Sequence, residues 1–362
     1  MQSRGEATGR IPSLDGLRAA AIALVVLTHA AGTRDIPIHS NYLDVGDFGV
    51  RIFFVISGYL ITTLLIAEHT RTGWISLPRF YLRRTFRIFP AFYVYLAALA
   101  AGWALGWLEL HRGDLVHAAT YTSNYQHDRS WEVGHLWSLA VEEQFYLLWP
   151  ALLVAVGRPR APWIAAAVIV LGPVVRIACW HLLPTGRAGI GESFHTVADV
   201  IAVGCLLAFV RPTLHAWPAY LRLQRSPLFL VAPAIAIAAN YTRSHMTISY
   251  LAGETAMNLG IALCVDWAIT HPDGVVGAIL NARPVVYLGT LSYSLYLWQQ
   301  PFLDRYSTAW VCAFPQNLGL AGVTALASYY LVERPLLRRR PAHIPTSPPA
   351  RTRTRAVRRA AR

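Results

Sequence analysis

Ten long runs of apolar residues restrict the fold of this chain more than any other feature. They lie at 16–33, 47–68, 86–108, 136–156, 163–183, 194–211, 227–241, 248–269, 284–303 and 309–332. A helix needs about 20 apolar residues to cross the hydrocarbon core of a bilayer. Barrel strands would instead alternate apolar and polar residues, and the sequence lacks that alternation. It therefore predicts an all-α, polytopic membrane bundle of about ten transmembrane helices.

Composition supports a membrane protein and excludes two other classes. Hydrophobic residues make up 55% of the chain and charged residues only 14%, whereas a soluble protein has about 25% charged residues. The net charge of +13 therefore belongs neither to a disordered polycation nor to a soluble nucleic-acid binder. All 32 basic residues are arginine, a bias that indicates a high-GC bacterium.

The positions of the arginines predict the topology. If both termini are cytoplasmic, inner segments hold 23 arginines and outer loops hold 6, as the positive-inside rule requires. Asp15 and His29 bracket the first apolar stretch, so we interpret it as a spanning helix rather than a signal peptide. We expect a multi-pass protein of the cytoplasmic membrane with three parts: a short cytoplasmic N-terminus (1–10), a membrane domain (11–337), and a disordered cytoplasmic tail rich in arginine and proline (338–362) that contacts lipid headgroups.

The first span contains two ionisable residues, Arg18 and His29. Eleven helical steps bring both side chains onto one stripe, about 16 Å apart. Ionisable groups within a membrane are costly and therefore mark candidate functional sites. His29 is either a general base or a structural residue that hydrogen-bonds a neighbouring helix.

An arginine cluster precedes the third apolar run. Arg83, Arg84 and Arg87 lie within five residues, and guanidinium groups bind phosphates through paired hydrogen bonds. The alternative is a role in topology and lipid contact. Arg84 and Arg87 are one turn apart and enter the span, which favours ligand binding for these two.

Polar residues also occur in other spans. In the fourth span, His135, Glu142 and Tyr146 fall on one helical line, and the carboxylate needs a partner, either His29 or an arginine, with a structural ion pair as the alternative. In the second span, Gly58 favours close helix packing, and the role of Ser57 stays open. We expect three further residues within spans to line an internal cavity: Asp199, Asp266 and Arg176. The four cysteines show no paired spacing, and the sequence contains no metal-binding motif.

These segments together resemble the acyltransferase-3 family of membrane O-acyltransferases. The resemblance rests on Ser13–Arg18 with His29, on Phe53–Leu60, on Arg84-x-x-Arg87, on His135–Tyr146, on Leu291–Trp298 and on Glu333-Arg334-Pro335. Two positions depart from the family pattern. Gln299 stands where a histidine is common, and Thr196-Val197-Ala198 replaces a segment that often carries arginine before Asp199.

The resemblance implies a ten-helix enzyme that moves an acyl group, commonly acetyl, from acyl-CoA to a hydroxyl. The acceptor carries a sugar and is either a cell-surface glycan or a secondary metabolite such as a macrolide. Acyl-CoA is a co-substrate, and neither a cofactor nor a metal is expected. The family's catalytic Arg-x10-His pair corresponds to Arg18 and His29, and its donor-binding pair corresponds to Arg84 and Arg87.

The resulting hypothesis is direct transfer with His29 as the general base. Arg18 stabilises the oxyanion, Glu142 orients His29 or Arg18, and the arginine cluster holds the donor phosphates. Four residues complete the expected substrate site: Asp15, Ser57, His135 and Tyr146. A relay with the acyl group on His29 or Ser57 is the mechanistic alternative. A proton-coupled transporter is the functional alternative, because a polar stripe through a helical bundle also suits ion transport.

Overall fold

The computed structural model describes residues 11–37 and 45–338, and within these ranges the chain is helical without a β-strand. The predicted all-α fold is therefore confirmed. The long helices are α1 (Pro12–Ala30), α2 (Gly46–Thr72), α3 (Leu77–Ala104), α6 (Leu136–Val156), α7 (Ala161–Leu182), α8 (Phe194–Ala216), α12 (Glu254–Thr270), α14 (Arg283–Trp298) and α15 (Gln316–Ser328). Shorter helices are α4 (Asp114–Ala119), α5 (Trp131–Gly134), α9 (Pro218–Arg225), α10 (Val231–Asn240), α11 (Met246–Ile248), α13 (Val275–Leu280) and α16 (Arg334–Arg338). The expected N-terminal segment 1–10, and all but the first residue of the expected tail 338–362, lie outside the described residues.

Seven helical segments of the described chain are long and apolar enough to cross a membrane. An eighth is obtained if α9 and the segment Pro227–Asn240, which meet at an angle of 78°, form one broken span. The expected ninth span corresponds to α14, with 16 residues, and the tenth corresponds to α15, which continues through a π-helical turn into α16. The polytopic bundle is confirmed, while the count of ten and the cytoplasmic termini stay predictions.

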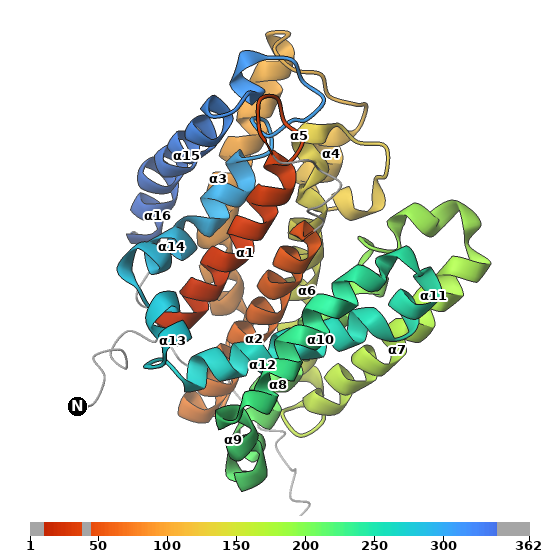
Figure 1. The fold of residues 1–362 in the computed structure, drawn as a ribbon, viewed down its shortest axis with the longest axis vertical. Helices are drawn as coiled ribbons and strands as arrows, with labels where there is room; N and C mark the ends of the chain where they lie inside the picture. The colour runs from red at the N-terminus through yellow and green to blue at the C-terminus, as the bar shows by residue number, and fades with distance from the viewer. Residues whose placement is uncertain (1–10, 38–44, 339–362) are drawn as a thin grey trace, which may run out of the picture.

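Helix α1 lies at the centre of the molecule between elements that are distant in sequence (Figure 1). It packs against α2 on one side and against α14 on the other. Helix α8 packs against both α2 and α7, and α10 packs against α12. The first helix is therefore in contact with both the N-terminal and the C-terminal parts of the bundle.

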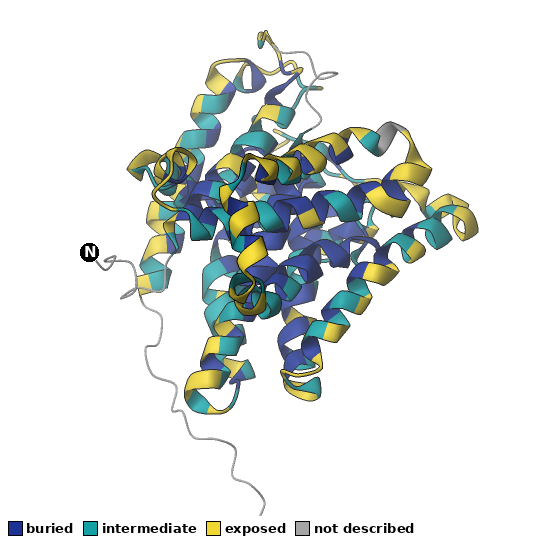
Figure 2. Ribbon diagram, turned by 60° about the horizontal axis from the view of Figure 1, so that its bottom comes forward, coloured by how far each residue is buried: buried dark blue, intermediate teal, exposed yellow. Residues whose placement is uncertain are grey.

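Burial follows the pattern of a bundle with an apolar core, a set of buried polar groups and an apolar outside. Buried residues lie along the middle of the bundle, and exposed residues cover its outer faces (Figure 2). Large apolar side chains on those faces are highly exposed, among them Leu147 at 62%, Trp163 at 77% and Val323 at 62%. Apolar side chains are favoured on surfaces that face lipid hydrocarbon, so this distribution agrees with a membrane-embedded bundle.

Two glycines bring α2 and α8 close together. A Cβ atom added to Gly58 would lie 2.1 Å from the carbonyl oxygen of Ile201. Reciprocally, a Cβ atom on Gly204 would lie 2.1 Å from the carbonyl oxygen of Val55. Only the absence of a side chain permits this approach. The packing interpretation of Gly58 is confirmed.

Replacing Gly58 with alanine should force α2 and α8 apart and destabilise the fold by about 1–3 kcal/mol, the usual cost of overpacking. Thermal unfolding of the purified protein in detergent measures the effect. Gly322→Ala is the matched control, because a Cβ atom there meets no atom within 4 Å. Equal melting temperatures for the two variants would contradict a close α2–α8 contact.

Candidate active site

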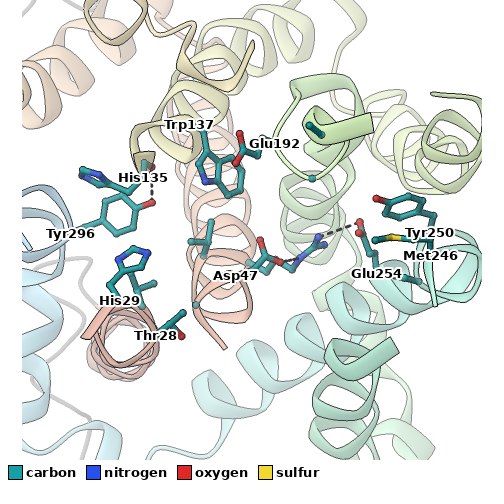
Figure 3. A pocket seen from close by; sticks show the side chains of 17 residues that line it. Thr28, His29, Asp47, His135, Trp137, Glu192, Met246, Tyr250, Glu254 and Tyr296 are labelled. Carbon is teal, nitrogen blue, oxygen red and sulfur yellow. Dashed lines mark hydrogen bonds and ion pairs between the residues drawn. The ribbon is translucent and has the colours of Figure 1, made fainter. Parts of the chain in front are cut away.

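The larger of two neighbouring cavities contains His29 and has a volume of about 410 Å³. We call it the His29 cavity. His29, His135 and Tyr296 lie on one side of it, Tyr250 and Glu254 lie on the other, and Trp137 and Asp47 lie between them (Figure 3). Polar and aromatic side chains from α1, α2, α6, α12 and α14, and from the segments that precede α6, α8 and α12, thus surround one space. They are Thr28, His29, Asp47, Arg51, His135, Trp137, Glu192, Tyr250, Glu254 and Tyr296.

A second, smaller cavity contains Arg18 and has a volume of about 50 Å³. We call it the Arg18 cavity. Its polar lining includes Arg18, Ser57 and Glu142, and its apolar lining comes mainly from α2 and α6. The Nε atom of Arg18 is buried and has no hydrogen-bond partner among the described residues. An unsatisfied buried donor of this kind is suited to binding a polar or anionic ligand.

Arg18 and His29 lie on the same continuous helix, as predicted, but they open into different cavities. Eleven residues of helix correspond to about 16 Å. Val50 and Tyr296 line both cavities and therefore stand at the boundary between them. In this conformation the two side chains do not face one common point. The expected role of Arg18 in stabilising the oxyanion at the carbonyl served by His29 stays a prediction.

His29 is held by a residue from the far end of the sequence. Its Nδ1 atom lies 2.9 Å from Oε1 of Gln299, the residue that follows α14. Its ring also packs edge-on against Trp131, with ring centroids 5.6 Å apart. Gln299 is one of the two positions where the sequence departs from the family pattern. That departure therefore directly contacts the predicted catalytic histidine.

The partners of Glu142 differ from those expected. Its Oε1 atom accepts a hydrogen bond from the hydroxyl of Ser57 at 2.5 Å and another from the hydroxyl of Tyr146 at 3.0 Å. These hydroxyls take the place of the predicted partner, His29 or an arginine. Arg18 nevertheless lines the same cavity as Glu142. The structure thus brings Ser57, Glu142 and Tyr146 together near Arg18 and away from His29.

The predicted donor-binding arginines lie beside this group. The guanidinium group of Arg84 lies 3.4 Å from the ring centroid of Tyr146, and its Nε atom is 3.7 Å from Glu143. Arg87 lies within electrostatic range of Arg18 and Arg84. Positive charge is therefore concentrated next to the Arg18 cavity, as a phosphate-binding role requires. Glu143 was not predicted as a site residue, because helical geometry turns it away from Glu142.

Three other predicted site residues, Arg83, His135 and Asp15, lie in three different environments. Arg83 lies 3.4 Å from Glu68 in an ion pair. The ring of His135 is buried in the wall of the His29 cavity, and its carbonyl oxygen accepts a hydrogen bond from Tyr296 at 2.9 Å. Asp15 lines neither of these two cavities, and its place in the substrate site stays a prediction. It lies where α1 meets α14, close to Gly289.

Sequence reasoning missed a buried charge network beside the His29 cavity. Arg51 forms ion pairs with Asp47 at 2.7 Å and with Glu254 at 3.2 Å. Arg176 forms ion pairs with Asp199 at 2.9 Å and with Glu254 at 3.4 Å. Asp47 and Arg51 have i, i+4 spacing, a sequence signal that could have suggested their pairing. Their link to Glu254 depends on tertiary packing.

The residues that were expected to line the cavity instead stabilise helix contacts. Asp199 and Arg176 form part of the network behind the His29 cavity. Asp266 is completely buried between α8, α9 and α12. It accepts hydrogen bonds from Arg211, His215, Tyr220 and Gln224. Buried carboxylates with several donors are satisfied structural groups.

The fold and the buried polar site define a polytopic, all-α membrane protein with a candidate catalytic centre inside its bundle. The acyltransferase-3 family model, described as an acyltransferase domain, matches residues 11–332. The chain therefore belongs to this family, which confirms the resemblance seen in the sequence.

Individual relatives give more detail. The chain is 31% identical to the peptidoglycan O-acetyltransferase OatA of Listeria monocytogenes, over 81% of this chain and 49% of that protein. It is 28% identical to the O-acetyltransferase OatA of Staphylococcus aureus, over 90% of this chain and 57% of that protein. The chain thus spans about half the length of these curated relatives. No solved structure gives a significant match.

Proposed function

We propose that this protein is a membrane O-acyltransferase that moves an acetyl group from acetyl-CoA to a hydroxyl group of a cell-surface glycan. The family membership and the names of the relatives support O-acetyl transfer to a glycan. The observation that carries the proposal is the position of His29, held by Gln299 in the wall of a cavity that adjoins the Arg18 cavity.

The His29 cavity is the proposed acceptor site. Trp137 and Tyr250 offer aromatic surfaces for the apolar faces of a sugar ring. The carboxylates of Asp47 and Glu192 accept hydrogen bonds from hydroxyl groups. A volume of about 410 Å³ is within the usual range for small-ligand sites. A glycan end with its hydroxyl near His29 fits this combination.

The Arg18 cavity and the adjoining arginines form the proposed donor site. Arg84 and Arg87 bind the phosphates of the donor, and Arg83 is a third candidate for this role. Arg18, in the wall of the Arg18 cavity, binds the polar part of the donor arm. The elongated pantetheine arm would then pass Val50 and Tyr296, so that its thioester reaches His29. Cytoplasmic delivery of the donor agrees with the predicted topology.

Direct transfer in this arrangement needs one proton acceptor, His29, and one leaving group, the thiolate of CoA. The acceptor hydroxyl gives its proton to His29 as its oxygen attacks the thioester carbonyl. The carbon–sulfur bond then breaks, and the thiolate of CoA takes up the proton from the imidazolium. A relay through His29 or Ser57 would instead produce an acylated protein when donor is supplied without acceptor.

Transfer by the purified protein in detergent tests the function. We expect labelled acetyl-CoA and peptidoglycan fragments to yield labelled glycan without any membrane gradient. A macrolide offered in parallel tests the alternative acceptor. Gradient-dependent transport in vesicles, together with no transfer in detergent, would refute the proposal and favour a transporter. Labelled protein formed in the absence of acceptor would replace direct transfer with the relay.

Arg84→Ala and Arg87→Ala should each raise the KM for acetyl-CoA about 10- to 100-fold. This range corresponds to the loss of one hydrogen bond to a charged group, about 1.5–3 kcal/mol. Arg71→Ala is the matched control, because Arg71 is exposed at the end of α2. Steady-state kinetics with varied donor provides the measurement. An unchanged donor KM in both variants would exclude these arginines from the donor site.

A further inference from the structure

Two consecutive glutamines follow α14, and both are buried. The exposed fraction is 0% for Gln299 and 3% for Gln300. Buried amides must be hydrogen-bonded to offset the loss of water. The two side chains are linked by a chain of hydrogen bonds that begins at the backbone carbonyl of Trp131 and ends at His29.

The hydrogen bonds fix the orientation of each amide in turn. The Nε2 atom of Gln300 donates to the carbonyl oxygen of Trp131 at 2.9 Å, and a carbonyl can only accept. The Oε1 atom of Gln300 is then free to accept from Nε2 of Gln299, at 3.0 Å. The Oε1 atom of Gln299 consequently faces Nδ1 of His29, at 2.9 Å. Because that oxygen can only accept, Nδ1 must carry the proton.

We propose that Gln299 and Gln300 are positioning residues that hold His29 in the tautomer protonated on Nδ1, so that its Nε2 atom is the proton acceptor for the acceptor hydroxyl. This inference rests on the proposed function of His29 as a general base. In serine proteases an aspartate orients the catalytic histidine in a comparable way. Here a neutral amide takes that place and is itself oriented by a second amide.

The charge of the group that contacts His29 affects the stability of its imidazolium form. Gln299, which follows α14, is uncharged, in contrast to an aspartate. The guanidinium group of Arg305 lies 5.4 Å from the ring centroid of Trp131, which in turn packs against His29. His135, from the start of α6, lines the same cavity. A neutral amide, unlike a carboxylate, adds no negative charge that would stabilise the imidazolium form.

Gln299→Glu and Gln299→Leu separate a positioning role from mere packing. We expect Gln299→Leu to lower kcat about 10- to 100-fold, by analogy with the range found for residues that orient metal-binding histidines. Gln299→Glu keeps size and hydrogen bonding, but its carboxylate favours the protonated imidazole. We therefore expect the acidic limb of its pH–rate profile to move to higher pH. A purely structural residue would not shift that profile.

Controls make the outcome decisive. Gln316→Glu introduces the same change at an exposed position at the start of α15 and should leave kcat and the pH profile unchanged. Gln300→Leu should lower kcat less than Gln299→Leu, because it removes only the group that orients Gln299. If Gln299→Leu fails to fold, the Gln299→Glu profile decides alone. An unshifted profile in folded Gln299→Glu overturns the inference. Normal activity of His29→Ala would instead overturn the proposed function.

Discussion

Replacement of His29 with alanine is expected to reduce acetyl transfer at least 100-fold while the protein still folds and inserts into the membrane. A general base contributes about 10²–10⁴-fold to a rate, and alanine cannot accept a proton. The half-buried ring faces a cavity and makes one side-chain hydrogen bond, so its loss should affect the bundle little. Transfer of label from acetyl-CoA to glycan, normalised to folded protein, measures the effect.

A second histidine provides the control for this experiment. His111 pairs with Asp128, which is 96% exposed, and neither residue lines either of the two cavities. His111→Ala should therefore retain wild-type transfer. If His29→Ala also retained it, His29 would be a structural residue that bonds α14, the alternative that the sequence left open. Loss of transfer with normal melting behaviour would support the catalytic role.

Replacement of Arg176 with alanine is expected to destabilise the protein by about 3–5 kcal/mol, the cost of removing one partner from a buried ion pair. Arg176 is completely buried and donates to the backbone of Thr196 and to Asp199, both at 2.9 Å. Its loss removes the ion-pair partner of Asp199 and one of the two ion pairs of Glu254. Thermal unfolding in detergent and the yield of folded protein measure the loss.

Two further variants test the cause of that instability. Arg187→Ala is the control, because Arg187 is exposed after α7. The double variant Arg176→Met with Asp199→Leu removes both charges, and replacing a buried pair with apolar residues is often neutral. We therefore expect the double variant to recover much of the lost stability. A double variant as unstable as Arg176→Ala would show that shape rather than charge determines the contribution of this site.

The site was predictable where its signals were local. The positions of Arg18 and His29 on one helical stripe follow from the period of an α-helix, and the structure places both on α1. The contact between Arg84 and Glu143 was harder to predict from the sequence, because Glu143 does not lie on the helical line that joins His135, Glu142 and Tyr146. The partners of Glu142 and the place of Asp199 were predicted incorrectly, because each depends on which helix is its neighbour.

The sequence by itself determined that this chain forms membrane-spanning helices, because an apolar run in lipid must satisfy its backbone hydrogen bonds internally and only a helix does so within one segment. Only the tertiary structure decided which polar groups meet. Gln299 reaches His29 across 270 positions of sequence, and Ser57 reaches Glu142 across 85. Such pairs arise from the packing of α1 against α14 and of α2 against α6. The packing of two helices depends on how their side chains fit together along the whole length of the contact. A local sequence pattern does not determine that fit.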